Sequence, residues 1–320
     1  MPANLTPDYF KAEEWYRSAS THEEKILALE QMLAVMPKHK GTDHLQADLK
    51  RKLSQLREAA TQQKKAGKHV DIFHVPKTGA GQVVLLGTPN SGKSAILAAL
   101  TNAKVNVADF PFATHAPVPG MVKHEDVQIQ LVDMPPVTAD YSAPGQVGTY
   151  RHCDIIALVI DLDGDMEDQW RVCTAYLESK NLITSEVQGP AKKVLCLGTK
   201  ADLAEPGLLD LLAQDCRYPF EFMEISTVTG QGLDALPRRL FDLLGVIRIY
   251  AKPPGKPADK TSPFTLPVGA TVQDLARTIH RQLADKLKTA RCWGSGVYDG
   301  QNVQLTHVLH DRDVVELHFA

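Results

Sequence analysis

The feature that most constrains this 320-residue chain is an octapeptide that fits the pattern G-x-x-x-x-G-K-[ST] without a gap: Gly87-Thr88-Pro89-Asn90-Ser91-Gly92-Lys93-Ser94. An apolar run, residues 82–86, precedes it, and a helix-forming stretch, residues 95–100, follows it. This order is typical of a phosphate-binding loop, because backbone N–H groups and the positive end of the helix then face one anion. We expect Lys93 to contact the β- and γ-phosphates of a nucleotide and Ser94 to bind Mg²⁺.

Short apolar runs alternate with helix-forming stretches after this loop. The apolar runs are residues 127–132, 155–160, 194–197 and 222–225, and the helical stretches are 95–100, 167–178, 208–212 and 233–244. Such alternation predicts an α/β fold, with a mostly parallel sheet and helices on both faces. A stretch rich in proline, residues 248–263, predicts a linker. Strands at 264–266 and 314–319 and a helix at 271–287 predict a small α+β unit after it.

The first 66 residues or so predict helices, because apolar residues recur at helical spacing. These residues are Ile26, Leu29, Leu33, Met36, Leu45, Leu49, Leu53 and Leu56. From residue 38 to residue 68 there are nine Lys and Arg but three Asp and Glu. The two interpretations are a solvated helical hairpin and a surface that contacts a phosphate backbone. We therefore divide the chain into a helical basic region (1–80), the α/β domain (81–247) and a C-terminal domain (248–320).

Bulk properties exclude several classes of protein. The net charge of −3 means that any nucleic-acid contact must be a local patch. The five cysteines are scattered with no Cys-x-x-Cys spacing, which argues against a zinc knuckle or a disulfide framework and favours a cytoplasmic location. No apolar run reaches 18 residues, so we expect no membrane span.

Two further residues stand where a nucleotide switch binds its metal ion. Thr114 lies in the loop after the first helix, where such proteins place a threonine on Mg²⁺ and the γ-phosphate. Asp133 follows the run 127–132, and its carboxylate would reach the metal through water. An aspartate at a strand end is often only a cap, but the order of the fragments favours a site. We assign Lys93 and Thr114 as the catalytic residues.

The remaining fragments predict a site for the base. Thr199-Lys200-Ala201-Asp202 follows the run 194–197 and resembles the guanine-binding pattern N-K-x-D. The carboxylate of Asp202 can accept two N–H groups from the edge of guanine, which adenine cannot offer. Lys200 can lay its stem along the face of the base, and Ser226-Thr227 fits the last base-contacting loop.

These fragments together resemble the Obg-type GTPases, and among them the developmentally regulated GTP-binding proteins. The segments that carry the resemblance are residues 37–42, 111–114, 117–120, 131–135 and 247–256. The resemblance implies GTP and GDP as ligands, a TGS domain of ubiquitin-like fold at the C-terminus, and docking on the ribosome or RNA, with no DNA expected. The short segment between residues 161 and 194 leaves little room for the subdomain that eukaryotic members insert, so we expect a compact relative.

The chain departs from the family pattern at a few positions. Pro136 stands where the family has a glycine whose N–H reaches the γ-phosphate, and proline has no N–H. Thr199 replaces an asparagine and Thr227 an alanine. Asn90 has two interpretations, a brace for the loop or a ligand of K⁺, which related GTPases use in place of an arginine finger.

Three functions follow as hypotheses. The first is a slow GTPase switch that docks on the ribosome or RNA through the basic helices and the TGS-like domain. The second is a nucleotide-stabilised scaffold with little or no hydrolysis, which Pro136 favours. The third is an ATPase or small-molecule kinase on the same fold, against which Asp202 and Thr114 argue.

Overall fold

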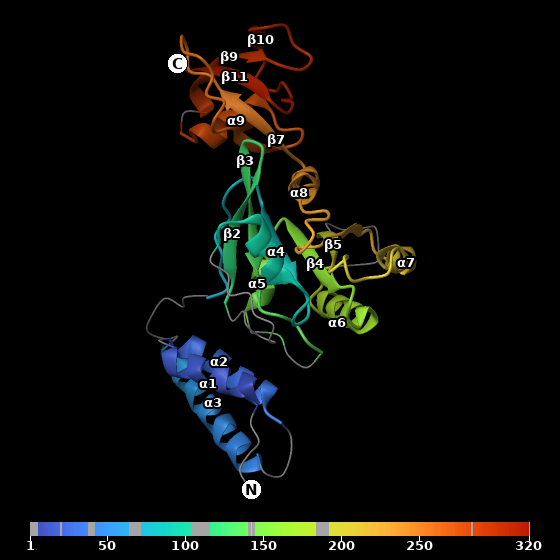
Figure 1. The fold of residues 1–320 in the computed structure, drawn as a ribbon. Helices are drawn as coiled ribbons and strands as arrows, with labels where there is room; N and C mark the ends of the chain where they lie inside the picture. Colours follow the sequence, from blue (N-terminus) through green and yellow to red (C-terminus); the bar gives the residue numbers. More distant parts are fainter. Residues whose placement is uncertain are drawn as a thin grey trace.

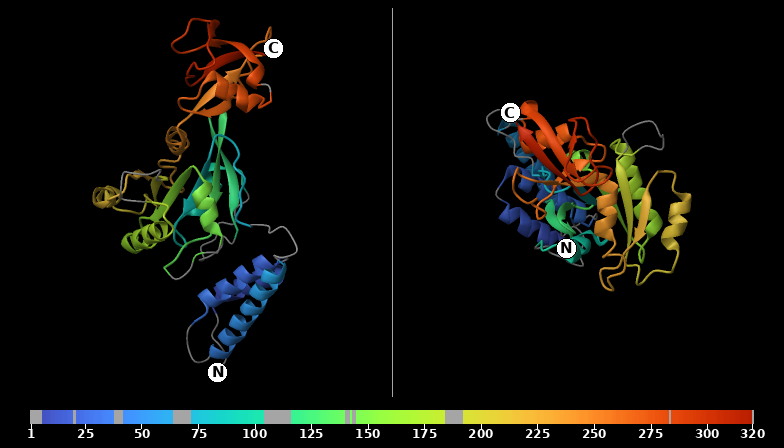
Figure 2. Two further views of the ribbon diagram at one scale, coloured as in Figure 1. Left: turned by 180° about the vertical axis from the view of Figure 1, so that it is seen from behind. Right: turned by 90° about the horizontal axis from the view of Figure 1, so that it is seen from above.

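The computed structural model describes residues 6–19, 21–37, 42–63, 72–103, 116–139, 142, 145–183, 192–282 and 284–319. Three parts follow one another along the molecule (Figures 1 and 2): the N-terminal helices, a six-stranded sheet with its helices, and a five-stranded sheet. None of the helices in these ranges is both long and apolar enough to cross a membrane.

The N-terminal part consists of α1 (Pro7–Ser18), α2 (His22–Val35) and α3 (Asp43–Gln63). The α2 helix begins at a capping box in which Thr21 and Glu24 bond each other's backbone N–H groups. The predicted apolar stripes form a separate small core, since Leu29, Leu49 and Leu53 are buried in it. The basic residues of α3, which are Lys50, Arg51, Lys52 and Arg57, are all exposed.

The central sheet has the strand order β2-β3-β1-β4-β5-β6, and only β2 runs antiparallel to its neighbour. The strands are β1 (Gln82–Leu86), β2 (Val118–His124), β3 (Val127–Asp133), β4 (Ile155–Asp161), β5 (Lys193–Thr199) and β6 (Glu221–Glu224). The prediction of a mostly parallel sheet is confirmed. The sequence analysis missed β2 because Pro119 and Gly120 disfavour a strand, but β2 is an edge strand, where proline is tolerated.

Helices cover both faces of this sheet, as predicted. They are α4 (Lys93–Leu100), α5 (Gln146–His152), α6 (Met166–Ser179), α7 (Leu208–Asp215) and α8 (Leu236–Leu244). Alternate residues of β1 enter two different cores. Val83 and Leu85 join the core that holds α4 and α8, whereas Val84 and Leu86 join the core that holds α5, α6 and α7.

Residues 72–80 differ from the predicted helical region 1–80. They form turns and irregular backbone with a single β-bridge from Gly79 to Ile129, and Ala80 donates its N–H to the carbonyl of Gln128 over 2.8 Å. Phe73 is buried in the core beneath α5, where its carbonyl accepts the hydroxyl of Thr149 over 2.5 Å. Burial of Phe73 stabilises this irregular path, and Pro76 disfavours a helix there.

The C-terminal part is a five-stranded sheet of order β10-β9-β11-β7-β8 with one helix packed on it. Its elements are β7 (Val246–Ala251), β8 (Phe264–Pro267), α9 (Val272–Ile279), the 3₁₀ helix η1 (Ala284–Lys286), β9 (Leu287–Trp293), β10 (Gln301–Val303) and β11 (Asp313–Phe319).

Two predictions for this part are wrong. The expected linker 248–263 begins with strand residues, because Ile247 and Ile249 are buried in the sheet's core while Arg248 lies on its other face. The expected helix 271–287 ends at Ile279, since His280 takes an extended backbone. Residues 287–293 then form a strand whose buried positions include Ala290 and Cys292, a period of two rather than 3.6.

Candidate functional site

Several of the predicted site residues lie at one edge of the central sheet. The octapeptide 87–94 joins β1 to α4, and Asp133, Asp161 and Thr199 end β3, β4 and β5. These strands are parallel, so their carboxyl ends meet at the same edge. The loop follows β1, which lies between β3 and β4, the place where open α/β sheets bind their ligands.

The loop takes its shape from residues that tolerate close contact or a left-handed backbone. A Cβ atom on Gly87 would lie 2.6 Å from the carbonyl oxygen of Val159, so only glycine fits there. Gly92 has φ +92° and Asn90 has φ +60°. The chain therefore turns sharply around the space that an anion would occupy, directly before the first turn of α4.

The ammonium group of Lys93 lies inside this loop. It donates to the carbonyls of Gly87 (3.2 Å) and Thr88 (2.7 Å) and to the hydroxyl of Ser91 (3.2 Å). Burial lowers the pKa of Lys93 to about 8, although nearby Asp133 acts in the opposite direction. A phosphate would offer this buried cation a charged partner in place of neutral oxygens.

Ser94 and Asp133 bring together two oxygen atoms of the kind that Mg²⁺ prefers. The hydroxyl of Ser94 donates to Oδ2 of Asp133 over 2.5 Å, and Asp133 is fully buried. This hydroxyl and carboxylate would hold Mg²⁺, which would offset the negative charge of a phosphorylated ligand. The predicted third member of this set, Thr114, lies outside the described residues.

At the base end of the predicted site, Asp202 is held in place by Ser226. The hydroxyl of Ser226 donates to Oδ1 of Asp202 over 2.5 Å and accepts the N–H groups of Val228 and Thr229. Ser226 is buried, whereas Asp202 and Thr227 are exposed in the neighbouring loops. The carboxylate of Asp202 is thus oriented by a fixed donor but still open to a ligand.

Thr199 links the two ends of the site, which the sequence analysis did not anticipate. Its hydroxyl donates to the carbonyl of Ser91 over 2.8 Å and also lies 3.2 Å from the carbonyl of Ile160. Thr199 is buried beneath the loop, close to Gly92. Thr199 therefore bonds the phosphate loop directly to the end of β5, from which the loop that carries Asp202 starts.

Two residues that the sequence analysis missed extend this link. Lys200 forms an ion pair with Asp161 over 2.5 Å. The amide of Gln169 bonds both backbone groups of Asp161, at 2.9 and 3.1 Å, and accepts the hydroxyl of Thr88 over 3.3 Å. Asp161 could have been found, because it ends a buried strand as Asp133 does. Gln169 offered no signal, since its position on α6 is that of an ordinary polar helix residue.

The segment after Asp133 is buried and fixed to the phosphate loop. Met134, Pro135, Pro136 and Val137 are all buried, and Met134 and Val137 belong to the core on the α6 side of the sheet. The N–H of Val137 donates to the carbonyl of Gly87 over 3.1 Å. Pro135 and Pro136 have no N–H to offer. This segment therefore presents few backbone donors to a ligand.

The described residues hold no group of three or more His, Cys, Asp and Glu side chains that could bind a metal ion. All five cysteines are free thiols, and burial raises the pKa of Cys173 to about 12. The chemistry on offer is therefore that of oxygen ligands, one buried ammonium group and a loop of backbone donors, which suits a phosphorylated ligand with Mg²⁺.

Comparison with known proteins agrees with this geometry. Residues 82–187 match the family of 50S ribosome-binding GTPases, and residues 247–319 match the TGS domain. An uncharacterized GTP-binding protein of Methanocaldococcus jannaschii is 28% identical over 361 aligned positions, with 92% of each chain covered. The Dictyostelium discoideum homolog of developmentally regulated GTP-binding protein 2 is 28% identical over 92% of this chain and 98% of its own.

Ribosome-interacting GTPase 1 of Saccharomyces cerevisiae is 26% identical over 93% of this chain and 99% of its own length. Its alignment extends over 366 positions, more than the 320 residues present here, so that relative carries residues that this chain lacks. This agrees with the expectation of a compact relative.

The buried ammonium group predicts that ligand binding takes up a proton at alkaline pH. A phosphate raises the pKa of Lys93 from about 8, so above pH 8 the protein gains a proton when the ligand binds. Above pH 8 the affinity for GDP should fall, with a limiting slope of roughly tenfold per pH unit. Calorimetry at pH 9 in two buffers of different ionisation enthalpy measures the uptake.

The controls are the same titrations at pH 7, where Lys93 is already charged, and the variant Lys93→Ala. The variant should bind GDP at least about tenfold more weakly and take up no proton at pH 9. Equal uptake by the parent and by Lys93→Ala would show that another group titrates.

Proposed function

Because this chain is a member of the developmentally regulated GTP-binding proteins, P-loop GTPases with a C-terminal TGS domain, we propose that it is a slow GTPase switch that docks on the ribosome or its RNA. It hydrolyses GTP to GDP and phosphate with Mg²⁺ as cofactor. The nucleotide lies along the sheet edge where β1, β3 and β5 end.

The observation that carries this proposal is the bonded connection between the phosphate loop and the loop that holds Asp202. The phosphate loop and the Asp202 loop are bonded through Thr199, and Asp202 is oriented by Ser226. An oriented carboxylate accepts two N–H groups from guanine, whereas adenine has no matching pair of donors. The geometry therefore favours a guanine nucleotide over the alternative of an ATPase or small-molecule kinase.

The rate is proposed to be slow because the segment after Asp133 lacks donors. Pro136 has no N–H, and the N–H of Val137 is bonded to Gly87. Val137 is apolar and fully buried, so it cannot orient an attacking water. In this proposal Asn90, exposed and left-handed at the loop's tip, supplies an oxygen to a K⁺ ion that offsets the missing charge stabilisation.

Docking is proposed to use α3 together with the TGS domain. The yeast relative is named for its interaction with the ribosome. On α3, Lys50, Arg51 and Lys52 are exposed, while Leu49 and Leu53 on the opposite side are buried. Arg51 also pairs with Asp48 at the surface, an exposed contact that a phosphate can replace at small cost.

The test of the proposal measures affinity for GDP, a GTP analogue and ATP, together with GTP turnover in K⁺ and in Na⁺. Guanine nucleotides should bind more tightly than ATP, and turnover should be slow but higher in K⁺. Preference for ATP would favour the kinase or ATPase hypothesis. Guanine binding without any turnover would favour the nucleotide-stabilised scaffold.

The choice of base should depend on Asp202. Asp202→Asn should weaken GTP binding and shift preference toward xanthine nucleotides, because xanthine offers a carbonyl where guanine offers an amine. The loss for GTP should be about 1–3 kcal/mol, measured by competition binding. Asp210→Asn, an exposed aspartate on α7, is the matched control and should bind like the parent. Unaltered preference in Asp202→Asn would contradict the assignment of the base site.

Restoring the missing donor should raise the rate. Pro136→Gly returns an N–H and backbone freedom, and one donor aimed at developing charge contributes about 2.7–4 kcal/mol to a barrier. Single-turnover GTP hydrolysis should rise at least about tenfold, and the affinity gap between a GTP analogue and GDP should widen. Pro135→Gly, one residue earlier, is the matched control. Turnover equal to the parent's in Pro136→Gly would show that Pro136 does not limit the reaction.

The basic face of α3 should determine the salt dependence of RNA binding. Replacing Lys50, Arg51 and Lys52 by glutamine should weaken binding to ribosomes or ribosomal RNA and flatten the plot of log affinity against log salt, since each phosphate contact adds to its slope. The matched control replaces three scattered, exposed basic residues of the α/β domain, Lys123, Arg171 and Arg238. Equal slopes for the two triple variants would leave α3 as a solvated face.

A further inference from the structure

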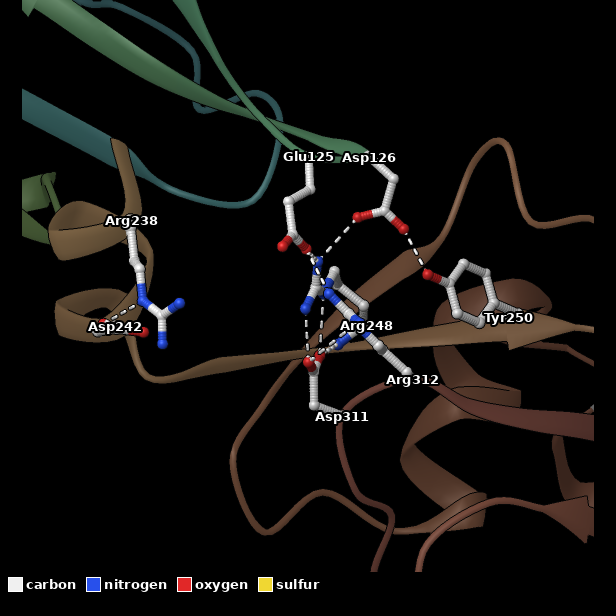
Figure 3. Close-up of polar contacts among 8 residues, drawn as sticks. All are labelled: Glu125, Asp126, Arg238, Asp242, Arg248, Tyr250, Asp311 and Arg312. Atoms are coloured by element: carbon white, nitrogen blue, oxygen red, sulfur yellow. Dashed lines mark hydrogen bonds and ion pairs between the residues drawn. The ribbon is translucent and has the colours of Figure 1, made fainter. Parts of the chain in front are cut away.

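A charged cluster joins the C-terminal sheet to the hairpin of β2 and β3 (Figure 3). We call it the Arg248 latch, and its members are Glu125, Asp126, Arg248, Tyr250, Asp311 and Arg312. The side chain of Arg248 is only 5% exposed. It bonds Asp311 within its own domain at 2.6 and 3.0 Å, and across the domain boundary it bonds Asp126 at 3.0 Å and Glu125.

Three further contacts strengthen the latch. Tyr250 donates its hydroxyl to Asp126 over 2.5 Å, and Arg312 bonds Glu125 over 2.6 Å. The guanidinium of Arg248 also lies 4.9 Å from the ring centre of Phe241 on α8. Hydrogen bonds from Arg248 and then Arg312 lower the pKa of Glu125 to about 2, so the carboxylate stays charged at neutral pH. Multidentate arginine contacts of this kind fix orientation as well as proximity.

The β2–β3 hairpin has its turn at the latch and its other end at the proposed nucleotide site. Its strands pair without interruption from His124 and Val127, beside the latch, to Val118 and Asp133. Asp133 accepts the hydroxyl of Ser94 in the phosphate loop. Seven residues of strand span about 20 Å, and Figure 1 shows this hairpin reaching from the central sheet to the C-terminal domain. The paired strands therefore form one continuous connection from the proposed nucleotide site to the latch.

Beside the latch, Val246 at the start of β7 packs against the core that holds α4 and α8. A cavity of about 500 Å³ lies beside the latch, lined by Gly79, Gln128 and residues of β8 and α9 among others. The chain connection is a single glycine, Gly245 with φ +65°, between α8 and β7. The latch supplies the charged contacts across this boundary and, together with Val246, fixes the orientation of the C-terminal domain.

We infer that the Arg248 latch couples occupancy of the nucleotide site to the TGS domain through the β2–β3 hairpin. The inference rests on the proposed function, since it needs guanine nucleotide at the phosphate loop. The TGS domain then responds to the nucleotide without touching it. By linkage, a partner that reorients the TGS domain changes nucleotide affinity by the same factor.

The test removes the hairpin side of the latch only. Glu125→Gln with Asp126→Asn leaves the pair of Arg248 and Asp311 inside the C-terminal domain. The matched control, Arg238→Gln with Asp242→Asn, removes an exposed ion pair on α8 that lies near the latch in Figure 3 but does not cross the boundary.

Every protein in the test carries Trp15→Phe and Trp170→Phe, so that Trp293 on β9 is the remaining tryptophan and reports melting of the TGS domain. GDP binding is measured by calorimetry on the same proteins. In the parent and the control, GDP at a hundredfold excess over its dissociation constant should raise the Trp293 melting temperature by roughly 5 °C. In the latch variant GDP should bind but leave that temperature unchanged.

Two results would overturn the coupling while leaving the proposed function intact. One is an equal GDP-induced shift in the latch variant, and the other is no shift in a parent that binds GDP. A parent that binds no GDP would instead overturn the proposed function, and the coupling with it.

Discussion

Parallel pairing of β1 with both β3 and β4 is the constraint from which the rest of the site follows. It brings the carboxyl ends of the three strands to one edge of the sheet. The phosphate loop lies at this edge, directly after β1. The loop then needs glycine where Val159 approaches and a left-handed backbone at Gly92. Lys93, the next residue, begins α4, and its ammonium group lies inside the loop. The strand topology therefore determines where a ligand can bind, and the side chains at that edge determine which ligand it is.

Polar side chains convert this edge into one connected unit. Thr199 and Gln169 each bond the phosphate loop from a different element, and Lys200 pairs with Asp161 between them. The bond of Thr199 is buried, and such a bond is costly to break because the remaining partner is left unsatisfied. The phosphate loop and the loop predicted to bind the base are thus connected by hydrogen bonds through Thr199.

The sequence predicted the phosphate loop and the strands around it because short-range sequence patterns determine both. A glycine-rich loop between a strand and a helix has few conformations, and buried parallel strands are continuous apolar runs. What it could not predict depends on distant contacts. The β2 strand contains Pro119 and Gly120 and forms only because β3 offers it an edge, and β7 was hidden in a proline-rich stretch because its partners, β8 and β11, come later in the chain. Arg248 likewise has no local signature, since its acidic partners lie 63 and more than 120 residues away.

The segment after Asp133 and the β2–β3 hairpin differ in their freedom to move when a nucleotide binds. A switch needs a part that changes its contacts with the nucleotide, and differential contact is what shifts an equilibrium. Pro135 and Pro136 together with the buried Val137 leave that segment little freedom. The β2 strand, by contrast, is paired on one side only and begins directly after the predicted first switch around Thr114. Movement that the segment after Asp133 resists can therefore enter the hairpin through β2. The Arg248 latch, at the other end of this hairpin, transmits such movement to the TGS domain.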